Sequence, residues 1–296
     1  TIKTVTKPKD RDINSEVMKL HQKASLGNKN VIKYIKKYYL SPKSFESLLT
    51  MSQIMQAEAI KTAVESHRRE MPYCMGTLYW QLNDCWPGAS WSSIDYYGRW
   101  KALHYKAKNF FHSIIISTIQ KDKNIEVYVI NDLNEIINCN LVIKLYDFNG
   151  KQLQYFTKAL KLNPVSAKKY FAIERKNLIG NFNKSEVLLR SFIKRNDKIL
   201  FRNNFYFVKP KDINIVKPKY KLQYEIFKDS ILITIIAQSF LYKVHIICMD
   251  CVGVFSENYF DLIFGEVKKI KFEIDSNPKI NCKDLSFNVK TMYDLI

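Results

Sequence analysis

The sequence lacks a long hydrophobic run. No apolar stretch approaches the roughly 18–20 residues that a helix needs to cross a bilayer, and the longest are short and strand-like, such as residues 231–237. The first ten residues, TIKTVTKPKD, also lack the basic start and the apolar segment of a secretory signal. We therefore expect no membrane as a partner.

Acidic residues are few compared with basic ones. Lysine and arginine number 47 against 28 aspartates and glutamates, which gives a formal net charge of +19. A nucleic-acid-binding protein usually gathers such charge on one face. Here residues 1–112 carry 18 basic and 9 acidic residues, and residues 113–296 carry 29 and 19. Because the excess is spread along the chain, drift of composition toward lysine explains it better than a binding patch. We expect no nucleic-acid partner beyond loose attraction to polyanions at low salt.

The six cysteines, at positions 74, 85, 139, 248, 251 and 282, do not have the spacing of a small disulfide-linked domain. The one CxxC motif, Cys248-Met-Asp-Cys251, has neither a second CxxC nor a nearby pair of histidines. It follows a strand-like run, so we interpret it as thiols at a strand end. The sequence predicts no metal site.

Residues 1–112 have the pattern of helices around a single strand. Apolar side chains recur at three- and four-residue steps through residues 41–72, which predicts one long amphipathic helix. Ser41 or Ser44 can cap its start, and Pro72 ends it. A shorter helix is expected at about 30–40, and helical spacing resumes after residue 94 and runs through Trp100. The run YCMGTLYW between them, residues 73–80, is typical of a buried parallel strand.

From residue 113 onward the pattern changes to the alternation of β-strands. Asn149-Gly150 and the residues around Asn196-Asp197 are turn signals between alternating runs. A stretch near 209–219 that contains two prolines indicates a linker or an edge. The two parts on either side are each of about 85–100 residues with some seven short strands, the size of an immunoglobulin-like sandwich.

All four tryptophans lie in one short stretch, GTLYWQLNDCWPGASWSSIDYYGRWKALHY, at residues 76–105. A strand that ends in WQLND and continues into a tryptophan-rich loop fits a (β/α)8 barrel, whose functional residues lie at the C-terminal ends of strands. An indole can stack on the apolar face of a sugar while Asn and Asp side chains bind its hydroxyls. We predict a site role for Trp80 and packing for Trp100, and either role for Trp86 and Trp91.

These residues carry a specific resemblance. The segment EAIKTAVESHRREMPYCMGTLYWQLNDCWPGASWSSIDYYGRWKALHYKAKNFF, within a similarity that runs from about Glu16 to Phe111, resembles the end of the catalytic barrel of β-mannosidases of glycoside hydrolase family 2. FSENYFDLIFGEVKKIKF, residues 255–272, resembles the C-terminal immunoglobulin-like domain of that family. The middle part matches more loosely and is assigned by its position.

The resemblance implies a multidomain chain of α/β and all-β parts. Residues 1–112 would be the C-terminal part of a (β/α)8 TIM barrel. Residues 113–210 and 211–296 would form two immunoglobulin-like β-sandwich domains, the second of the mannosidase type. One strand with its flanking helices cannot close a barrel of about 250 residues. We therefore expect residues 1–112 to depend on the missing N-terminal domains of the same polypeptide as a partner.

The resemblance also implies a retaining glycosidase mechanism with two carboxylates and no cofactor. The family's Ser-Glu-Phe-Gly nucleophile motif and its Asn-Glu acid motif do not occur here. Both catalytic carboxylates are therefore expected upstream of Thr1. What carries over is a substrate-binding set: Trp80 would line the sugar subsite, and Asn83 and Asp84 match the WQLND motif, either touching sugar or supporting the loop. His21 could approach the cleft, although a structural role is the more common one.

The function that follows is that of a retaining exo-β-mannosidase, which removes terminal β-D-mannose from oligosaccharides or glycoconjugates. The substrate partner would be a β-mannoside oligosaccharide. The intact polypeptide would be the enzyme, and this segment alone would be inactive. The alternative is a non-catalytic β-sandwich protein that binds glycans or partners through its aromatic side chains and positive charge.

Overall fold

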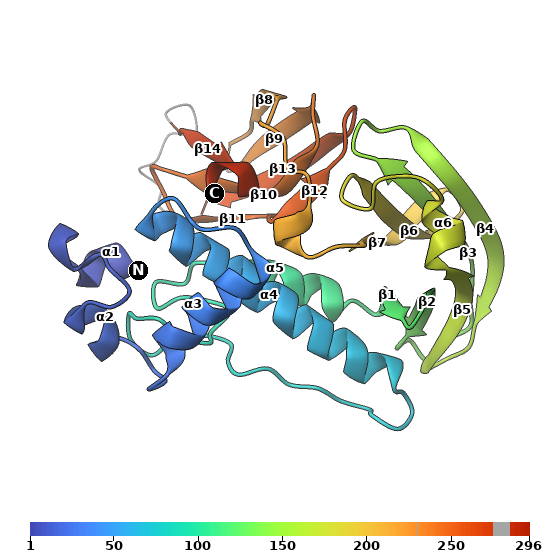
Figure 1. Cartoon of the computed structure of the whole chain (residues 1–296), viewed down its shortest axis with the longest axis horizontal. Helices are drawn as coiled ribbons and strands as arrows, with labels where there is room; N and C mark the ends of the chain where they lie inside the picture. Colours follow the sequence, from blue (N-terminus) through green and yellow to red (C-terminus); the bar gives the residue numbers. More distant parts are fainter. Residues whose placement is uncertain (229, 275–284) are drawn as a thin grey trace. The chain divides into compact units, whose positions relative to one another are not determined.

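The computed structural model describes residues 1–228, 230–274 and 285–296 (Figure 1). The chain forms two compact units. The first comprises residues 1–58, 79–106 and 215–296, and the second comprises residues 59–78 and 107–214. Among the described residues, no helix has the length and apolar character that a bilayer span requires.

The helices are α1 (Ile2–Val5), η1 (Pro8–Asp10), α2 (Glu16–Leu20), α3 (Gly27–Tyr38), α4 (Phe45–Arg69), α5 (Ala102–Phe110), α6 (Arg175–Ile179), η2 (Pro210–Asp212) and η4 (Met292–Asp294). The strands of the first sandwich are β1 (Ile114–Lys121), β2 (Asn124–Asn131), β3 (Ile137–Asp147), β4 (Gln152–Leu162), β5 (Ser166–Glu174), β6 (Val187–Arg195) and β7 (Lys198–Tyr206). Those of the second are β8 (Tyr220–Ile226), β9 (Ser230–Ala237), β10 (Leu241–Cys248), β11 (Gly253–Phe255), β12 (Phe260–Leu262), β13 (Val267–Ile274) and β14 (Phe287–Lys290).

The long helix α4 confirms the amphipathic helix that the spacing of apolar residues predicts. Of its two candidate caps, Ser44 is the one used, because its Oγ accepts a hydrogen bond of 3.1 Å from the backbone N–H of Ser47. Met51, Ile54 and Val64 are almost fully buried, as the apolar face requires. A barrel fragment on its own would be expected to leave the apolar faces of its helices uncovered. This expectation is wrong for α4, whose apolar stripe is buried within this chain.

The first sandwich, in the second unit, has two antiparallel sheets ordered β1-β2-β5 and β4-β3-β6-β7. Their inner faces form a core of isoleucine, leucine and valine side chains. Figure 1 shows β4 curving along β3, and the two strands are joined at the predicted Asn149-Gly150 turn. Gly150 has φ +85°, and Asn196 and Asp197, between β6 and β7, have φ +48° and +61°. Two left-handed residues are what the two-residue Asn196-Asp197 turn requires, and the single left-handed Gly150 fits the longer three-residue loop between Asp147 and Lys151.

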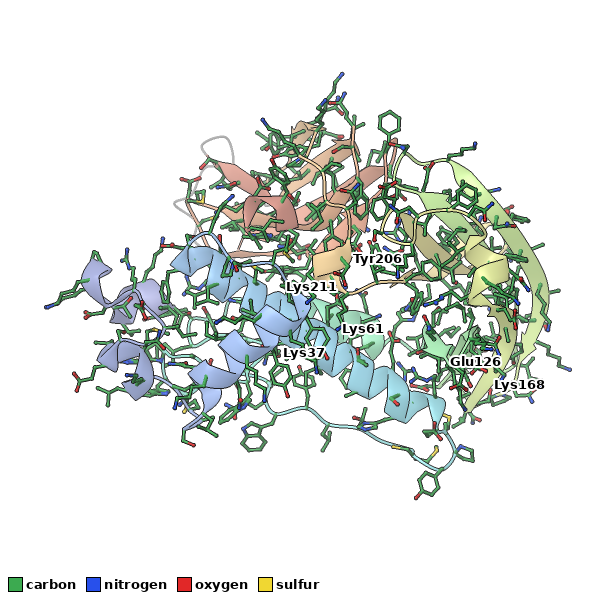
Figure 2. The ribbon with its side chains drawn as sticks, viewed as in Figure 1. Lys37, Lys61, Glu126, Lys168, Tyr206 and Lys211 are labelled. Atoms are coloured by element: carbon green, nitrogen blue, oxygen red, sulfur yellow. The ribbon has the colours of Figure 1, made fainter. Side chains whose placement is uncertain are left out.

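On the outer face of the β1-β2-β5 sheet, polar contacts of Glu126, which Figure 2 labels, join strands β2 and β5. Its carboxylate lies 2.8 Å from Lys169 Nζ on β5 and accepts a hydrogen bond of 2.8 Å from the hydroxyl of Tyr128. The hydrogen bond from Lys169, which is stronger than the opposing effect of burial, lowers the pKa of Glu126.

The second sandwich, in the first unit, has a four-stranded sheet ordered β11-β13-β9-β8 and, in the described part of the chain, a three-stranded sheet ordered β12-β10-β14. Its core also takes in Tyr105 from α5. Each sandwich therefore has seven described strands, and the all-β prediction for residues after 113 is confirmed. The proline-containing stretch between the sandwiches has no strand, as expected of a linker.

The predicted buried strand at residues 73–80 does not form. These residues are extended in part but pair with no other strand in the described structure. Leu78 is 99% exposed and Trp80 is 74% exposed. A strand needs a neighbour for its backbone hydrogen bonds, and the described residues supply none here.

The CxxC thiols lie at and beyond the end of β10, as expected, with Cys248 Sγ 3.4 Å from Cys251 Sγ. The described residues contain no group of three His, Cys, Asp or Glu side chains that could hold a metal ion. Cys282 lies outside the described residues.

Candidate functional site

The tryptophan-rich loop, residues 80–101, belongs to the first unit. Trp80, Trp86 and Trp91 are 74%, 39% and 42% exposed, so three of the four indoles present surface to solvent. Asn83 is exposed as well, whereas Asp84 is buried. Of the predicted site residues, Trp80 and Asn83 are therefore accessible to a ligand, and Asp84 faces the interior of the loop.

Backbone hydrogen bonds give this loop its shape although it contains no strand. Ser93 N–H donates to the carbonyl of Gln81 at 2.9 Å, and Ile94 N–H donates to that of Leu82 at 2.8 Å. From the first half of α4, Gln56 Nε2 donates to the carbonyl of Trp91 at 2.7 Å. The carbonyls that follow Trp80 are thus held in place by the far side of the loop.

A buried polar cluster fills the inside of the loop. Ser92 Oγ donates to Asp84 Oδ2 at 2.6 Å, and Lys101 Nζ lies 2.6 Å from Ser92 Oγ and 3.4 Å from Asp84 Oδ2. The Asp84 side chain is fully buried. Burial lowers the pKa of Lys101, and the Asp84 carboxylate opposes that shift. A buried charge pair of this kind holds a loop in one conformation, because breaking the pair would leave a buried charge without its partner.

Replacing Asp84 with asparagine is expected to lower the free energy of unfolding by about 1–2 kcal/mol, because the shape is kept but Lys101 loses its charged partner. Chemical denaturation monitored by tryptophan fluorescence would measure it. Asp197→Asn, at an exposed turn position with positive φ, is the matched control and should change stability little. Equal effects of the two variants would contradict a supporting role for Asp84.

A second carboxylate of the loop, Asp95, also serves the fold. Its Oδ1 accepts hydrogen bonds from the backbone N–H groups of Tyr97 and Arg99 at 2.9 and 3.0 Å, and Arg99 Nε donates to Oδ2 at 2.9 Å. Burial opposes ionisation of Asp95, but hydrogen bonds, that from Thr1 foremost, outweigh it and lower its pKa. Neither loop carboxylate is placed as an attacking group.

Trp100 packs, as predicted, although it precedes α5 and does not lie within it. Its ring lies 4.3 Å from that of His104 and 5.2 Å from that of Tyr105, edge to face, and it packs against the core of the second sandwich. His104 Nδ1 lies 3.0 Å from Ser93 Oγ. The base of the loop is therefore tied to the sandwich through Trp100.

His21 is placed against the same loop. Its ring stacks on that of Trp86, with centroids 5.1 Å apart and planes 5° apart, and its Nδ1 donates to the carbonyl of Val17 at 2.9 Å. The amide of Ala89 donates to the carbonyl of His21 at 3.2 Å. A side chain at Gly88 would come within 2.7 Å of that carbonyl, which explains the glycine. His21 thus orients Trp86, which is a structural role.

Sequence reasoning missed Ser92 and Lys101. Each of them directly follows a tryptophan in a polar stretch. A single sequence does not distinguish a buried lysine from the many exposed ones. Chemically, the loop offers exposed indoles and an amide on a rigid polar frame. This arrangement can bind a sugar face by stacking, and it contains no pair of carboxylates poised for hydrolysis.

The two sandwiches match known domain families. Residues 123–212 match the mannosidase Ig/CBM-like domain, and residues 215–295 match an Ig-fold domain of mannosidases. Over 277 residues the chain is 28% identical to β-mannosidase A of Aspergillus flavus, covering 86% of this chain and 30% of that protein.

Solved structures share the fold. The β-D-mannosidase of Dictyoglomus thermophilum is 22% identical with a TM-score of 0.84, covering 98% of this chain and 35% of that one. The exo-chitosanase of Amycolatopsis orientalis is 16% identical with a TM-score of 0.77, covering 98% of this chain and 40% of that one. The chain spans about a third of the length of the curated relatives it matches. The chain is therefore a homologue of the β-mannosidases of glycoside hydrolase family 2 and corresponds to their C-terminal portion.

Proposed function

We propose that the intact polypeptide is a retaining exo-β-mannosidase to which this chain contributes one wall of the sugar site. The observation that carries the proposal is the exposed indole of Trp80 on a loop fixed by buried hydrogen bonds, in a homologue of β-mannosidases. A fixed aromatic surface is suited to sugar stacking, because it loses little conformational freedom on binding.

The proposed organisation has three parts. Residues 1–112 are the end of a (β/α)8 barrel, and residues 113–210 and 211–296 are separate β-sandwich domains. The family matches at 123–212 and 215–295 support the second and third parts. The extended, unpaired residues 73–80 support the first, since they are the barrel strand in this scheme and need neighbours from elsewhere in the polypeptide.

Within the site, Trp80 stacks on the sugar ring, Asn83 binds a hydroxyl, and Asp84 acts as a positioning residue through Ser92 and Lys101. The nucleophile and the acid are two carboxylates from the polypeptide preceding Thr1, roughly 5–5.5 Å apart as retention requires. One attacks the anomeric carbon while the other protonates the leaving oxygen. Water then releases mannose from the covalent intermediate, and the segment alone is inactive.

The fold alone does not select the sugar, because an exo-chitosanase shares it. The test is an assay of the protein made from the full coding sequence on aryl β-mannoside and aryl β-glucosaminide. Hydrolysis of the mannoside with retained configuration is expected. Preference for the glucosaminide would contradict the proposed substrate, and glycan binding without any hydrolysis would favour a non-catalytic sandwich protein.

In the full-length enzyme, Trp80→Ala is expected to lower kcat/KM for an aryl β-mannoside by several-fold or more, from lost stacking worth about 1–2 kcal/mol. Steady-state kinetics would measure it. Phe182→Ala removes an aromatic ring that is 46% exposed on the first sandwich and serves as the control. Unchanged kinetics for Trp80→Ala would remove this residue from the site.

A further inference from the structure

The first sandwich carries an open hollow of about 510 Å³ on the outer face of its four-stranded sheet, at the edge toward the β6–β7 turn. This volume is in the range of small-molecule sites. Its polar lining consists of Asn138, Asn140, Lys161, Lys194, Arg195 and Asn196. All of them belong to the second unit.

Strand register explains why these side chains meet. Asn138 lies opposite Lys161 on β4, and Asn140 lies opposite Lys194 on β6. Side chains alternate along a strand, so these residues point outward while Cys139 between them points into the core. The hollow is therefore built mainly by three adjacent strands, with Asn196 of the β6–β7 turn at its edge.

A small residue makes the depression. Ala159 on β4 lies opposite Asn140 on β3, and it lines the hollow between longer side chains. Since neighbouring strands are only about 4.8 Å apart, one alanine among asparagines and lysines leaves a shallow recess.

The charged residues that line the hollow are all cations. Lys161, Lys194 and Arg195 line it, and none of its lining residues in the described structure is a carboxylate. In the described part of the chain none of these three cations forms an ion pair, whereas Lys169 on the other sheet of the same sandwich is paired with Glu126. Cations that line one hollow without counter-charge favour an anion, and Arg in particular binds phosphate, sulfate or carboxylate through two parallel hydrogen bonds.

The geometry points to a binding site for an anionic saccharide, with Lys161 and Lys194, which point outward from β4 and β6, on its charged substituent. Arg195, at the end of β6, adds positive charge at the rim, and the asparagine side chains bind the hydroxyls. A neutral sugar is disfavoured because no aromatic ring lines the hollow for stacking. Single-stranded nucleic acid is disfavoured for the same reason. This site is separate from the tryptophan loop and does not rest on the proposed hydrolase activity.

Isothermal titration calorimetry of the 296-residue chain with glucose 6-phosphate, glucose 6-sulfate, glucuronic acid, glucose and inorganic phosphate would test the site. The charged sugars are expected to bind, more weakly as salt rises, and to bind more tightly than glucose or phosphate. Lys161→Gln/Lys194→Gln/Arg195→Gln should weaken binding about tenfold or more.

Two further variants separate a built site from diffuse charge. Ala159→Tyr fills the hollow without changing charge and should weaken binding as strongly as the triple variant. Lys121→Gln/Lys123→Gln/Lys184→Gln removes the same charge from exposed positions of the same sandwich and should change affinity less than about twofold. Circular dichroism checks that each variant is folded.

Several outcomes would overturn the proposal: no binding of any charged sugar, equal loss in the control triple, or undiminished binding by Ala159→Tyr. Binding of glucose or of inorganic phosphate as tight as that of glucose 6-phosphate would do the same. The proposal would also be overturned if poly(dT) bound more tightly than the charged sugars and the triple variant Lys161→Gln/Lys194→Gln/Arg195→Gln abolished that binding.

Discussion

Replacing Lys243 with methionine is expected to lower the free energy of unfolding by about 3–5 kcal/mol, because the buried carboxylate of Asp261 loses its nearest cation. Glu58, whose side chain is 30% exposed, keeps a second partner in Lys106 at 3.3 Å. The side chain of Lys243 is 5% exposed. Its Nζ lies 2.8 Å from Glu58 Oε1 on α4 and 3.7 Å from Asp261 Oδ2 on β12. Burial alone would lower the pKa of Lys243, but Asp261 and Glu58 more than offset this and raise it well above its usual value, so the lysine stays charged.

The backbone at Lys243 is adapted to this contact. Its φ of +55° is left-handed, and the β10–β12 register shifts between Leu241 and Val244, as at a β-bulge. The bulge directs the Lys243 N–H to Asp261 Oδ1 at 2.9 Å. A left-handed lysine costs about 1–2 kcal/mol. The contact with α4 and β12 offsets that cost, and it ties the helix to the second sandwich within the first unit.

Thermal and chemical denaturation of the chain would measure the effect. Lys269→Met, exposed on β13, is the control and should change stability by less than about 0.5 kcal/mol. Adding Asp261→Asn to Lys243→Met should recover part of the lost stability. The asparagine keeps a side-chain oxygen that accepts the hydrogen bond from the backbone N–H of residue 243, but it carries no charge. Loss no greater than that of the control would show that the buried cation is dispensable.

The second large effect concerns His245, which makes the fold sensitive to acid. The side chain is buried on β10, its ring stacks on that of Tyr259 at 5.5 Å, and among the described residues neither ring nitrogen has a hydrogen-bond partner. Burial lowers the pKa of His245 to about 4, aided by Lys290 and opposed by a backbone contact of Lys243 and by Asp294.

The unfolded chain therefore takes up a proton on this histidine at a higher pH than the folded chain does. Stability from this group is complete above about pH 6.5 and is lost as the pH falls toward 4. The loss amounts to about 2 kcal/mol at pH 5. In His245→Phe, which keeps the stacked ring but does not titrate, this part of the pH dependence should disappear.

Denaturation of the parent and of His245→Phe between pH 7 and pH 5 would measure the difference between their slopes. His67→Gln alters an exposed histidine and should leave the slope of the parent unchanged. Parallel curves for the parent and His245→Phe would contradict the assignment.

Much of the fold could be predicted because it depends on local patterns. The periodicity of residues 45–69 and the cap at Ser44 mark α4, and Asn149-Gly150 marks the β3–β4 turn. Trp100 could be assigned to packing because apolar residues recur around it. Each of these signals acts within a few residues of itself, so a single sequence contains it.

The remaining features depend on distant parts of the chain. YCMGTLYW reads as a buried strand, but strand formation depends on neighbours that the pattern does not contain. The partners of Lys101 and Lys243 are two serines, two aspartates and a glutamate, the farthest of them 185 residues away along the chain. Among 47 basic residues, the sequence does not show which few are buried. The hollow near Ala159 likewise depends on the register of three strands.

Hydrogen exchange at residues 75–82 tests most directly the claim that this chain is one part of a larger catalytic domain. In the isolated chain these amides are expected to exchange rapidly, since the segment pairs with no described strand, while the amides of α4 are protected. In the full-length protein we expect the same amides to become as protected as those of the sandwich strands. Equally rapid exchange in both proteins would contradict the account.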